Sequence, residues 1–457
     1  MLTKTTNRLI PSLMILSACL LIYACWTLLP HPLVGLALGL VPLAILFVLK
    51  QPFLMVLLFV LFSFFRLHEV FHQLYLLRIP LLLSVASLGA LVWHVLVTRK
   101  VEIYWSPELT RASLFFVLVV LSIVLALNRP LALSYFTSIY WKIIVMTFVI
   151  AWLVQTVRDF SLSLHLITLS GLLVGLVALY NKANSISLVE GTRVTIGRDL
   201  GSVLGDPNDL SLVLLFPFSF ALALMLSPNI SRQQRLFGVV TTIVLILAII
   251  ATQSRGGLLG IVAVIASFAW RRVASKTLLI SCGSLLLAAL YLFAGISGRE
   301  SGGAAEAGID ESAMGRLHAW DAAFRMALDN PLSGIGIDNF YHNYYFYSNF
   351  WDGVNHAVHS TWFGVLAETG FLGLCVFLAM VISVIRNARQ SLYKVQENRH
   401  QFPPIMSAIA EGNLSGIIGF CVAGTFLTQG FTWPLYILLA FTVAVAHFVS
   451  TTNEAEK

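Results

Sequence analysis

Charged residues are scarce in this chain. Asp, Glu, Lys and Arg make up 11% of its 457 residues, whereas an ordinary soluble domain carries about 25%. Hydrophobic residues reach 58%, and the mean hydropathy is +0.87. This composition excludes an ordinary soluble globular protein and directs attention to the membrane.

Cysteine is also rare, and its five positions show no metal-ligand spacing. All five fall within long apolar segments, so we expect them to be small apolar packing residues. They are Cys19, Cys25, Cys282, Cys375 and Cys421. We therefore expect no metal site and no cofactor.

Long apolar runs fill most of the sequence. A hydrocarbon core of ~30 Å takes roughly 20 apolar residues per helix, and lipid leaves a bare backbone unsatisfied, so the spans should be helical. The sequence therefore predicts an all-α polytopic membrane protein with about 12–14 transmembrane helices. The predicted spans are 10–29, 33–49, 52–67, 79–97, 110–127, 133–155, 160–180, 210–227, 236–252, 257–270, 277–296, 361–385, 405–427 and 431–450.

Basic residues set the orientation of such a protein. Most of the 28 Lys and Arg fall in segments that are cytoplasmic if the N-terminus is cytoplasmic, Arg271 and Arg272 among them. The first span follows Lys4 and Arg8 and lacks a small-residue cleavage site, which favours a signal anchor. We expect both termini to be cytoplasmic. The net charge of +7 then reflects topology and not a nucleic-acid surface.

The spans and loops divide the chain into five regions. These are N-terminal helices over 1–180, an outer loop over 181–209, central helices over 210–296, a large outer loop over 297–360 and C-terminal helices over 361–450. Most of the unusual polar residues fall in the two outer loops, so we expect the chemistry there.

A surface helix is predicted within the large loop, from Ser312 to Leu328. Its apolar residues recur at spacings of three and four, and Asn330-Pro331 should stop it. The stripe consists of Leu317, Trp320, Phe324 and Leu328. We expect this helix to lie on the membrane surface or to cap a cavity.

The earlier outer loop ends in Gly205-Asp206-Pro207-Asn208-Asp209, directly before an apolar run. One interpretation is a helix start with Asn208 or Asp209 as the N-cap. The other is that the same helix N-terminus faces an anionic substrate.

Arg255 lies in an outer turn, Thr252-Gln253-Ser254-Arg255-Gly256-Gly257. It is either an arginine that extends to lipid headgroups or a phosphate ligand, since guanidinium offers a planar fork for phosphate. Arg193, Arg198 and Arg316 also lie in outer segments. Each alone suits a solvated surface, but together with Arg255 they could converge on one doubly charged group.

His359 is the sharpest candidate in the large loop, because an imidazole titrates near neutral pH and can accept a hydroxyl proton. His356 and His342 are secondary candidates. Aromatic residues crowd the same region, as an interfacial belt or as sugar-stacking platforms. They are Tyr341, Tyr344, Tyr345, Tyr347, Phe350, Trp351 and Trp362.

Lys142 falls within a predicted span. A charge inside the membrane is costly and suggests a role. It could neutralise a headgroup or pair with Glu368, and the sequence leaves both open.

His359-Ser360, nine residues and Gly370-Phe371-Leu372-Gly373 resemble the signature of the O-antigen ligase and O-antigen polymerase superfamily. Three further segments resemble it in the same order, over roughly residues 185–385. They are 205–209, Gln253 to Gly257, and Gly315-Arg316 through Trp320 to Gly336. The Asp-Pro-Asn-Asp form departs from the Asn-Pro-Asn form of many members.

The resemblance implies a metal-independent glycosyltransferase of the bacterial inner membrane. Such an enzyme moves a glycan from undecaprenyl diphosphate to an acceptor hydroxyl at the periplasmic face. The acceptor is lipid A-core for a ligase, a growing polysaccharide for a polymerase, or a protein. Membrane lipids and other polysaccharide-assembly proteins are its expected partners, and nucleic acid is not.

In that superfamily, arginines hold the donor diphosphate and the loop histidine serves the acceptor. Arg255 and Arg316 match by motif and His359 by signature, so these three are the expected catalytic residues. Arg193 and Arg198 match only by loop. The expected substrate-binding residues are Arg193, Arg198, His356, Tyr344 and Trp362. A single displacement at the anomeric carbon would invert its configuration.

Two other classes of protein compete with this interpretation. A flippase or transporter for lipid-linked sugars would show inverted repeats, broken helices and polar sites at the midplane. The concentration of polar residues in outer loops favours the enzyme. The third class is an inactive subunit of an export complex.

Overall fold

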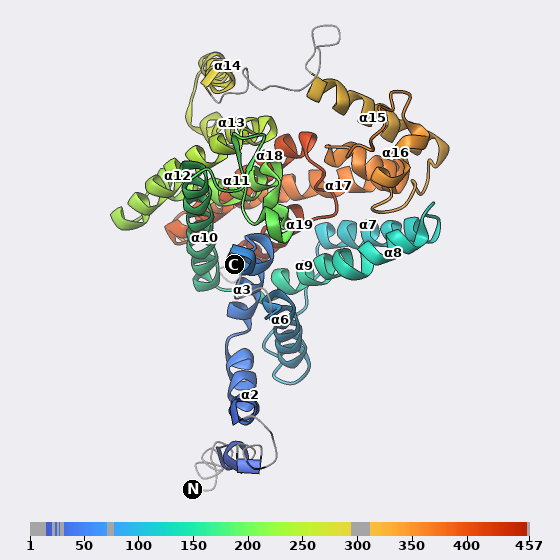
Figure 1. The fold of residues 1–457 in the computed structure, drawn as a ribbon. Coiled ribbons are helices and arrows are strands. Elements are labelled where there is room, and N and C mark those ends of the chain that lie inside the picture. The colour runs from blue at the N-terminus through green and yellow to red at the C-terminus, as the bar shows by residue number, and fades with distance from the viewer. Residues whose placement is uncertain are drawn as a thin grey trace.

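The structure is a computed structural model, and it describes residues 15–20, 23–24, 27, 32–70, 77–293 and 311–454. Helices dominate it (Figure 1). The main helices are α2 (Pro32–Lys50), α3 (Pro52–Phe64), α4 (Leu67–Val70), α6 (Ile79–Leu96), α7 (Pro107–Val124), α8 (Arg129–Tyr135), α9 (Trp141–Leu153), α10 (Val157–Ala183), α11 (Pro207–Leu226), α12 (Arg232–Thr252), α13 (Arg255–Arg272), α14 (Lys276–Phe293), α15 (Glu311–Asp329), α16 (Phe340–Tyr347), α17 (Thr361–Glu397), α18 (Pro404–Ala423) and α19 (Trp433–Glu454).

Short elements complete the described part. The π-helix η1 (Phe136–Tyr140) joins α8 to α9, and 3-10 turns η2 (Arg198–Leu200), η3 (Val203–Gly205) and η4 (Gly424–Phe426) flank the long helices. The strands β1 (Leu188–Val189) and β2 (Arg193–Val194) form an antiparallel hairpin. This hairpin lies in the predicted outer loop 181–209.

Nine of the described helices are long and apolar enough to cross a membrane. The all-α polytopic fold is thereby confirmed, although this number is below the expected 12–14. The predicted span 10–29 lies largely outside the described residues, and α13 and α14 form but are not among the nine.

The predicted spans 33–49 and 52–67 do not form two separate straight crossings. They become α2 and α3, which meet at an angle of 95° and together could make a tenth, broken span. Pro52 stands at the first position of α3, where its missing N–H removes a helix bond and interrupts the helix. In Figure 1, α2 extends away from the main body of helices.

The long helix α11 lies at the centre of the bundle and is buried along nearly its whole length. It packs against α10, α12, α13 and α18. Small residues permit this close approach, as in many membrane bundles. A Cβ on Gly171 would lie 2.3 Å from Pro217, and one on Gly238 would lie 2.8 Å from the carbonyl oxygen of Ala221. This packing fixes the N-terminus of α11, which borders the candidate site.

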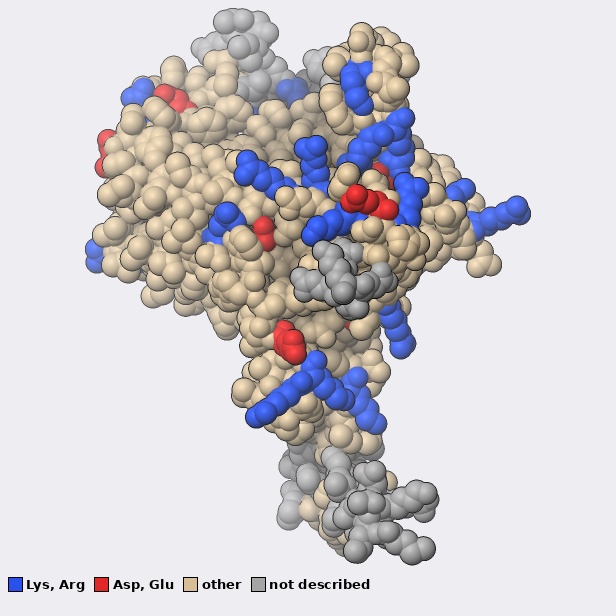
Figure 2. Space-filling view, turned by 180° about the vertical axis from the view of Figure 1, so that it is seen from behind, with Lys and Arg blue, Asp and Glu red and all other residues tan. Residues whose placement is uncertain are grey.

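Large uncharged areas cover the face shown in Figure 2 and surround a gathering of Lys and Arg. Within the bundle, Arg271 and Arg272 both bind the buried Glu411. The Nε atom of Arg271 donates to Glu411 Oε1 at 3.3 Å, and Arg272 donates to Oε2 at 2.8 Å. A buried carboxylate paired in this way ties α13 to α18.

The predicted surface helix is confirmed as α15, Glu311–Asp329, which ends directly before Asn330 and Pro331. Its inner face, however, differs from the predicted apolar stripe. Leu317, Phe324 and Leu328 are 45%, 43% and 56% exposed, and only Trp320 of the stripe is half-buried. The buried residues are Ala319, Ala322, Ala323, Met326 and Ala327. Small side chains therefore pack α15 against α17 and leave the large ones outside, and its place on the membrane surface stays a prediction.

The Gly370 position breaks α17. Its φ of 72° and ψ of −174° are not helical, and the Pro331–Gly336 loop hydrogen-bonds to the freed backbone. The amide of Phe371 donates to the Pro331 carbonyl at 2.8 Å, and the amide of Ile335 donates to the Ala367 carbonyl at 2.9 Å. The first glycine of the signature thus anchors the large loop to α17.

Gly370→Ala should destabilise the protein. The φ and ψ of Gly370 fall in a region that is essentially confined to glycine and costs another residue roughly 1–3 kcal/mol. The added Cβ would also lie 2.6 Å from the Pro331 carbonyl oxygen. Thermal unfolding in detergent should show a lower Tm. The control is Gly89→Ala in α6, where no atom lies within 4 Å. Equal Tm values for the two variants would contradict the anchoring role.

Of the four described cysteines, only Cys421 packs against the hydrophobic core. Cys19, Cys282 and Cys375 are exposed on the helices, and Cys421 is half-buried. The expectation that they are packing residues is wrong for the three exposed ones within this chain, because their side chains lie on outward helix faces. Cys25 lies outside the described residues.

Candidate functional site

The N-terminus of α11 forms one side of the candidate site. Asp206, and neither Asn208 nor Asp209, is the N-cap, since its Oδ1 accepts from the Asn208 amide at 2.7 Å and from the Asp209 amide at 3.2 Å. The predicted cap was wrong because Pro207, with its fixed φ and no N–H, suits the first helical position. The side chain of Asn208 is therefore free of capping and can bind another element.

Arg193 uses Asn208 to join three elements. Its side chain is 5% exposed. One terminal nitrogen donates to Asn208 Oδ1 at 2.8 Å, and its Nε donates to the Thr252 carbonyl at 3.1 Å. A terminal nitrogen of Arg193 also forms an ion pair with Glu190 Oε1 at 3.8 Å. Arg193 thus holds β2, the start of α11 and the end of α12 together.

Arg255 opens α13 directly after that point. Ser254 caps the helix by accepting from the Gly257 amide at 3.2 Å. A Cβ on Gly257 would lie 2.5 Å from Ser211 Oγ, and one on Gly256 would lie 3.3 Å from Phe426. Glycine at 257 is needed for the close approach of α13 to α11, and glycine at 256 eases the contact with η4.

Arg316 reaches the same place from α15. Its guanidinium carbon lies 6.0 Å from the centre of the Phe426 ring, within cation–π range. One turn later, Trp320 stacks on Phe363 with ring centres 5.1 Å apart, and its Nε1 donates to the Val358 carbonyl at 3.1 Å. The start of α15 is therefore fixed beside Phe426 and beside the backbone that leads to His359.

His359 stands at the entry to α17 with a φ of 44°. A left-handed backbone costs a residue with a Cβ about 1–2 kcal/mol, and such strain gathers at functional sites. Ser360 follows as the N-cap, with its Oγ accepting from the Phe363 amide at 3.4 Å. The backbone thus holds the imidazole in a position that an ordinary helix start would not provide.

The charges around His359 come from several segments. Burial lowers the pKa of His359 from its ordinary value, and the positive charge of Arg316 lowers it further. Asp206 raises this pKa, while His356 and Arg193 lower it. Burial and the two arginines outweigh the single carboxylate, so the imidazole is neutral at neutral pH and its free nitrogen can accept a proton.

The structure brings most of the predicted residues together, with two qualifications. Arg255 is not among the charges that act on His359. Residues on either side of it in the chain, Thr252 and Gly256, contact Arg193 and Phe426. The Thr252 carbonyl accepts a hydrogen bond from Arg193. Gly256 lies against Phe426, whose ring faces the guanidinium of Arg316. Arg198 is exposed in η2 and is not among those charges either.

The remaining predicted residues, His356, Tyr344 and Trp362, differ in how far they are buried. His356 Nε2 lies 2.9 Å from Asp352 Oδ2, and its ring meets the buried Tyr344 at 5.4 Å, edge to face. Tyr344 is 1% exposed, so it packs against the inner side of the His356 ring. Trp362 is half-buried and donates to Thr425 Oγ1 at 3.0 Å. Their role in substrate binding stays a prediction.

Two of the crowded aromatic residues are exposed and pack against each other. Tyr345 and Trp351 are 52% and 46% exposed, and their ring centres lie 4.7 Å apart, edge to face. Both were among the crowded aromatic residues of the sequence but were not singled out, because the pattern alone does not tell buried rings from open ones.

Sequence reasoning missed Asp206 as a neighbour of His359 and Phe426 as the platform for Arg316. Asp206 was part of a quoted motif but carried no signal beyond helix capping. Phe426 gave no signal, since it is one apolar residue in an apolar span. In the described residues, no group of three or more His, Cys, Asp or Glu could hold a metal ion.

The comparisons with known proteins bear on this same region. The family model described as O-antigen ligase matches residues 240–378. Over these residues, which are less than half of the chain, the sequence is similar to that family. The match confirms the resemblance to the O-antigen ligase and polymerase superfamily, and it contains Arg255, Arg316 and His359. Arg193 and Asp206 lie before it in the chain. No curated protein matches the sequence.

Proposed function

We propose that the protein is an inverting glycosyltransferase at the periplasmic face of the bacterial inner membrane. It transfers a glycan from undecaprenyl diphosphate to an acceptor hydroxyl, as an O-antigen or exopolysaccharide polymerase or as an O-antigen ligase. Arg193, Arg255 and Arg316 hold the donor diphosphate, and His359 activates the acceptor.

The observation that carries this proposal is the convergence of outer segments on His359. The charges of Arg316, Arg193 and Asp206 come from three separate parts of the chain and all act on its imidazole. A surplus of fixed guanidinium charge beside a neutral base suits a reaction between a diphosphate ester and a hydroxyl.

The chemistry requires little beyond these groups. The acceptor oxygen forms a bond to the anomeric carbon while the bond from that carbon to the diphosphate oxygen breaks. The electron pair leaves with the diphosphate, and the hydroxyl proton passes to His359. Preorganised arginines stabilise the negative charge that develops on the leaving group. One displacement of this kind inverts the anomeric carbon.

A gene deletion followed by glycan analysis tests the proposal and separates its forms. Loss of a ligase leaves lipid-linked polymer in the membrane and bare lipid A-core. Loss of a polymerase leaves single repeat units. A flippase, the alternative function, would change only the sidedness of the lipid-linked glycan, with neither its length nor its attachment altered, and that outcome would refute the enzyme.

The pH profile should depend on the charges beside His359. Because its pKa is lowered, activity should persist below pH 6.5 and fall only as His359 protonates. Arg316→Gln removes a charge that lowers this pKa, so the acidic limb of kcat/KM should move to higher pH. Asp206→Asn keeps a good N-cap but removes the charge that raises the pKa, so the limb should move to lower pH.

The matched control for the pH profile is Arg325→Gln on the same surface helix. Arg325 pairs with Asp321 at 2.8 Å and is not among the charges that act on His359. Its profile should equal that of the native protein. Shifts of Arg316→Gln and Asp206→Asn in the same direction would contradict the electrostatic account.

A further inference from the structure

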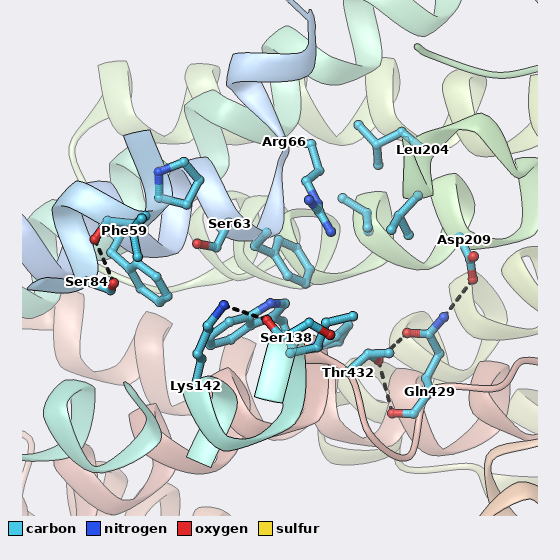
Figure 3. A pocket seen from close by; sticks show the side chains of 18 of the residues that line it. Phe59, Ser63, Arg66, Ser84, Ser138, Lys142, Leu204, Asp209, Gln429 and Thr432 are labelled. Carbon is cyan, nitrogen blue, oxygen red and sulfur yellow. Dashed lines mark hydrogen bonds between the residues drawn. The ribbon is translucent and has the colours of Figure 1, made fainter. Parts of the chain in front are cut away.

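A pocket lies on the other side of the start of α11 from the arginine and histidine group, which consists of Arg193, Arg255, Arg316 and His359. It has a volume of about 630 Å³ and is enclosed by α3, α6, the α8–η1–α9 segment, the start of α11 and residues 429–434. Figure 3 shows side chains from these elements pointing toward a common space. The proposed chemistry uses none of its lining residues.

Three cationic side chains line this pocket: Arg66, Arg78 and Lys142. Arg66 is paired with Glu69 at 2.9 Å. Within the described part of the chain, neither Arg78 nor Lys142 makes an ion pair. The one carboxylate in the lining, Asp209, accepts from Gln429 Nε2 at 2.6 Å. The pocket therefore has a surplus of positive charge.

Lys142 does not pair with Glu368, one of its two expected roles. Its Nζ donates to the Ser138 carbonyl at 2.6 Å, while Glu368 Oε1 accepts from the Phe340 amide at 3.4 Å. Ser138 belongs to the π-helix η1, and π-bulges in helices frequently mark functional sites. An ammonium held within a span by one backbone oxygen still has two N–H groups to offer.

The lining also contains a buried hydroxyl, that of Ser63. Ser63 is 7% exposed, and its Oγ has no hydrogen-bond partner among the described residues. A buried polar atom left unsatisfied is costly and calls for a partner. Ser63 lies in the wall of the pocket, but neighbouring atoms cover its Oγ, so the main anion contacts are those of Arg78 and Lys142.

The rest of the lining is apolar. Phe59 and Trp433 meet edge to face at 5.2 Å, and Phe64, Leu81, Ile139 and Leu212 continue the same wall. A small hydrated anion would gain nothing from these surfaces. They suit a ligand whose charged head is attached to a hydrocarbon chain.

We propose that this pocket binds the phosphate group of an amphiphilic lipid, with Arg78 and Lys142 as its main anion contacts, Arg66 beside them, and the apolar wall against the chain. The pocket borders the candidate site, since Asp209 binds Gln429 and the Gln429 amide donates to Thr361 Oγ1 at 3.1 Å. The lipid site does not require the proposed transferase function, because none of its contacts takes part in the proposed chemistry.

Native mass spectrometry of the delipidated full-length protein tests this site. The probes are dioctanoyl phosphatidic acid, dioctanoyl phosphatidylcholine with the same chains, and inorganic phosphate. We expect phosphatidic acid to bind saturably and more tightly than the other two. Lys142→Gln and Arg78→Gln should each weaken its binding by about tenfold, since each removes one charge-assisted contact. Lys142→Arg should retain most of the affinity.

The control is Arg129→Gln, which removes an exposed cation at the start of α8 that does not line the pocket. Its affinity for phosphatidic acid should equal that of the native protein, as should that of Arg255→Ala. Because Arg78 and Lys142 lie on different helices, a folding defect in one variant leaves the other as a test.

Equal binding of the two lipids, or unchanged affinity in both Lys142→Gln and Arg78→Gln, would overturn the proposal. Displacement of phosphatidic acid by inorganic phosphate at the same concentration would also overturn it, since the site would then bind a free anion. Loss of lipid binding in Arg255→Ala would instead place the lipid in the arginine and histidine group.

Discussion

Glycan transfer should fall by about 10²–10⁴-fold when His359 is replaced by asparagine, the usual range for loss of a general base. Asparagine is the useful replacement because it tolerates the left-handed backbone that His359 adopts, with its φ of 44°. His359→Ala should lose a similar amount of activity but also adds backbone strain. The measurement is product formation by purified protein with a lipid-diphosphate-linked glycan donor.

His342→Ala provides the matched control for His359. His342 lies in the same large loop, is exposed and contacts Tyr341, so its loss should leave the rate nearly unchanged. All three variants should show native insertion and native Tm, apart from a small loss for His359→Ala. A His359→Asn variant with more than a third of native activity would remove the base from the mechanism.

The second large loss of glycan transfer is expected when Arg255 is replaced. Arg255→Ala should lower kcat by about 10²–10³-fold. This is the usual loss when an enzyme loses one preorganised donor to the negative charge that develops in the transition state. Arg255→Lys should recover only part of this, because an ammonium cannot offer the planar fork of a guanidinium. Steady-state kinetics with varied donor would separate the effect on kcat from that on KM.

Arg325→Ala is the control for Arg255, since Arg325 is an exposed arginine of α15 paired only along its own helix with Asp321. Its kinetics should match those of the native protein. The donor-binding role of Arg255 would be contradicted if both alanine variants had the same small effect, because Arg255 would then be a surface charge.

Some of this structure was predictable because its causes are local. Apolar runs and Pro or Gly at their ends determine where helices begin and stop, and α15 formed within one residue of its predicted limits. The order of the arginine and histidine motifs also predicted a common outer site, since each motif lies at the end of a span on the same predicted side.

Other features depend on contacts between distant segments and left no local signal. The Phe426 platform lies close to α13, and Gly256 at the start of that helix leaves room for it. The lipid pocket combines Lys142 with Arg78 and with residues 429–434, which are far apart in the chain. On α15 the large apolar residues suggested the inner face, but the alanines gave the closer contact with α17.

The most direct test of the central claim is a cryo-electron microscopy structure of the protein with undecaprenyl diphosphate bound. The account predicts density for the diphosphate between Arg193, Arg255 and Arg316, with its oxygens within hydrogen-bond distance of at least two of these guanidinium groups and His359 facing the position that the acceptor would take. Diphosphate density in the pocket of Arg78 and Lys142, or on any other surface while the arginine group stays empty, would contradict it.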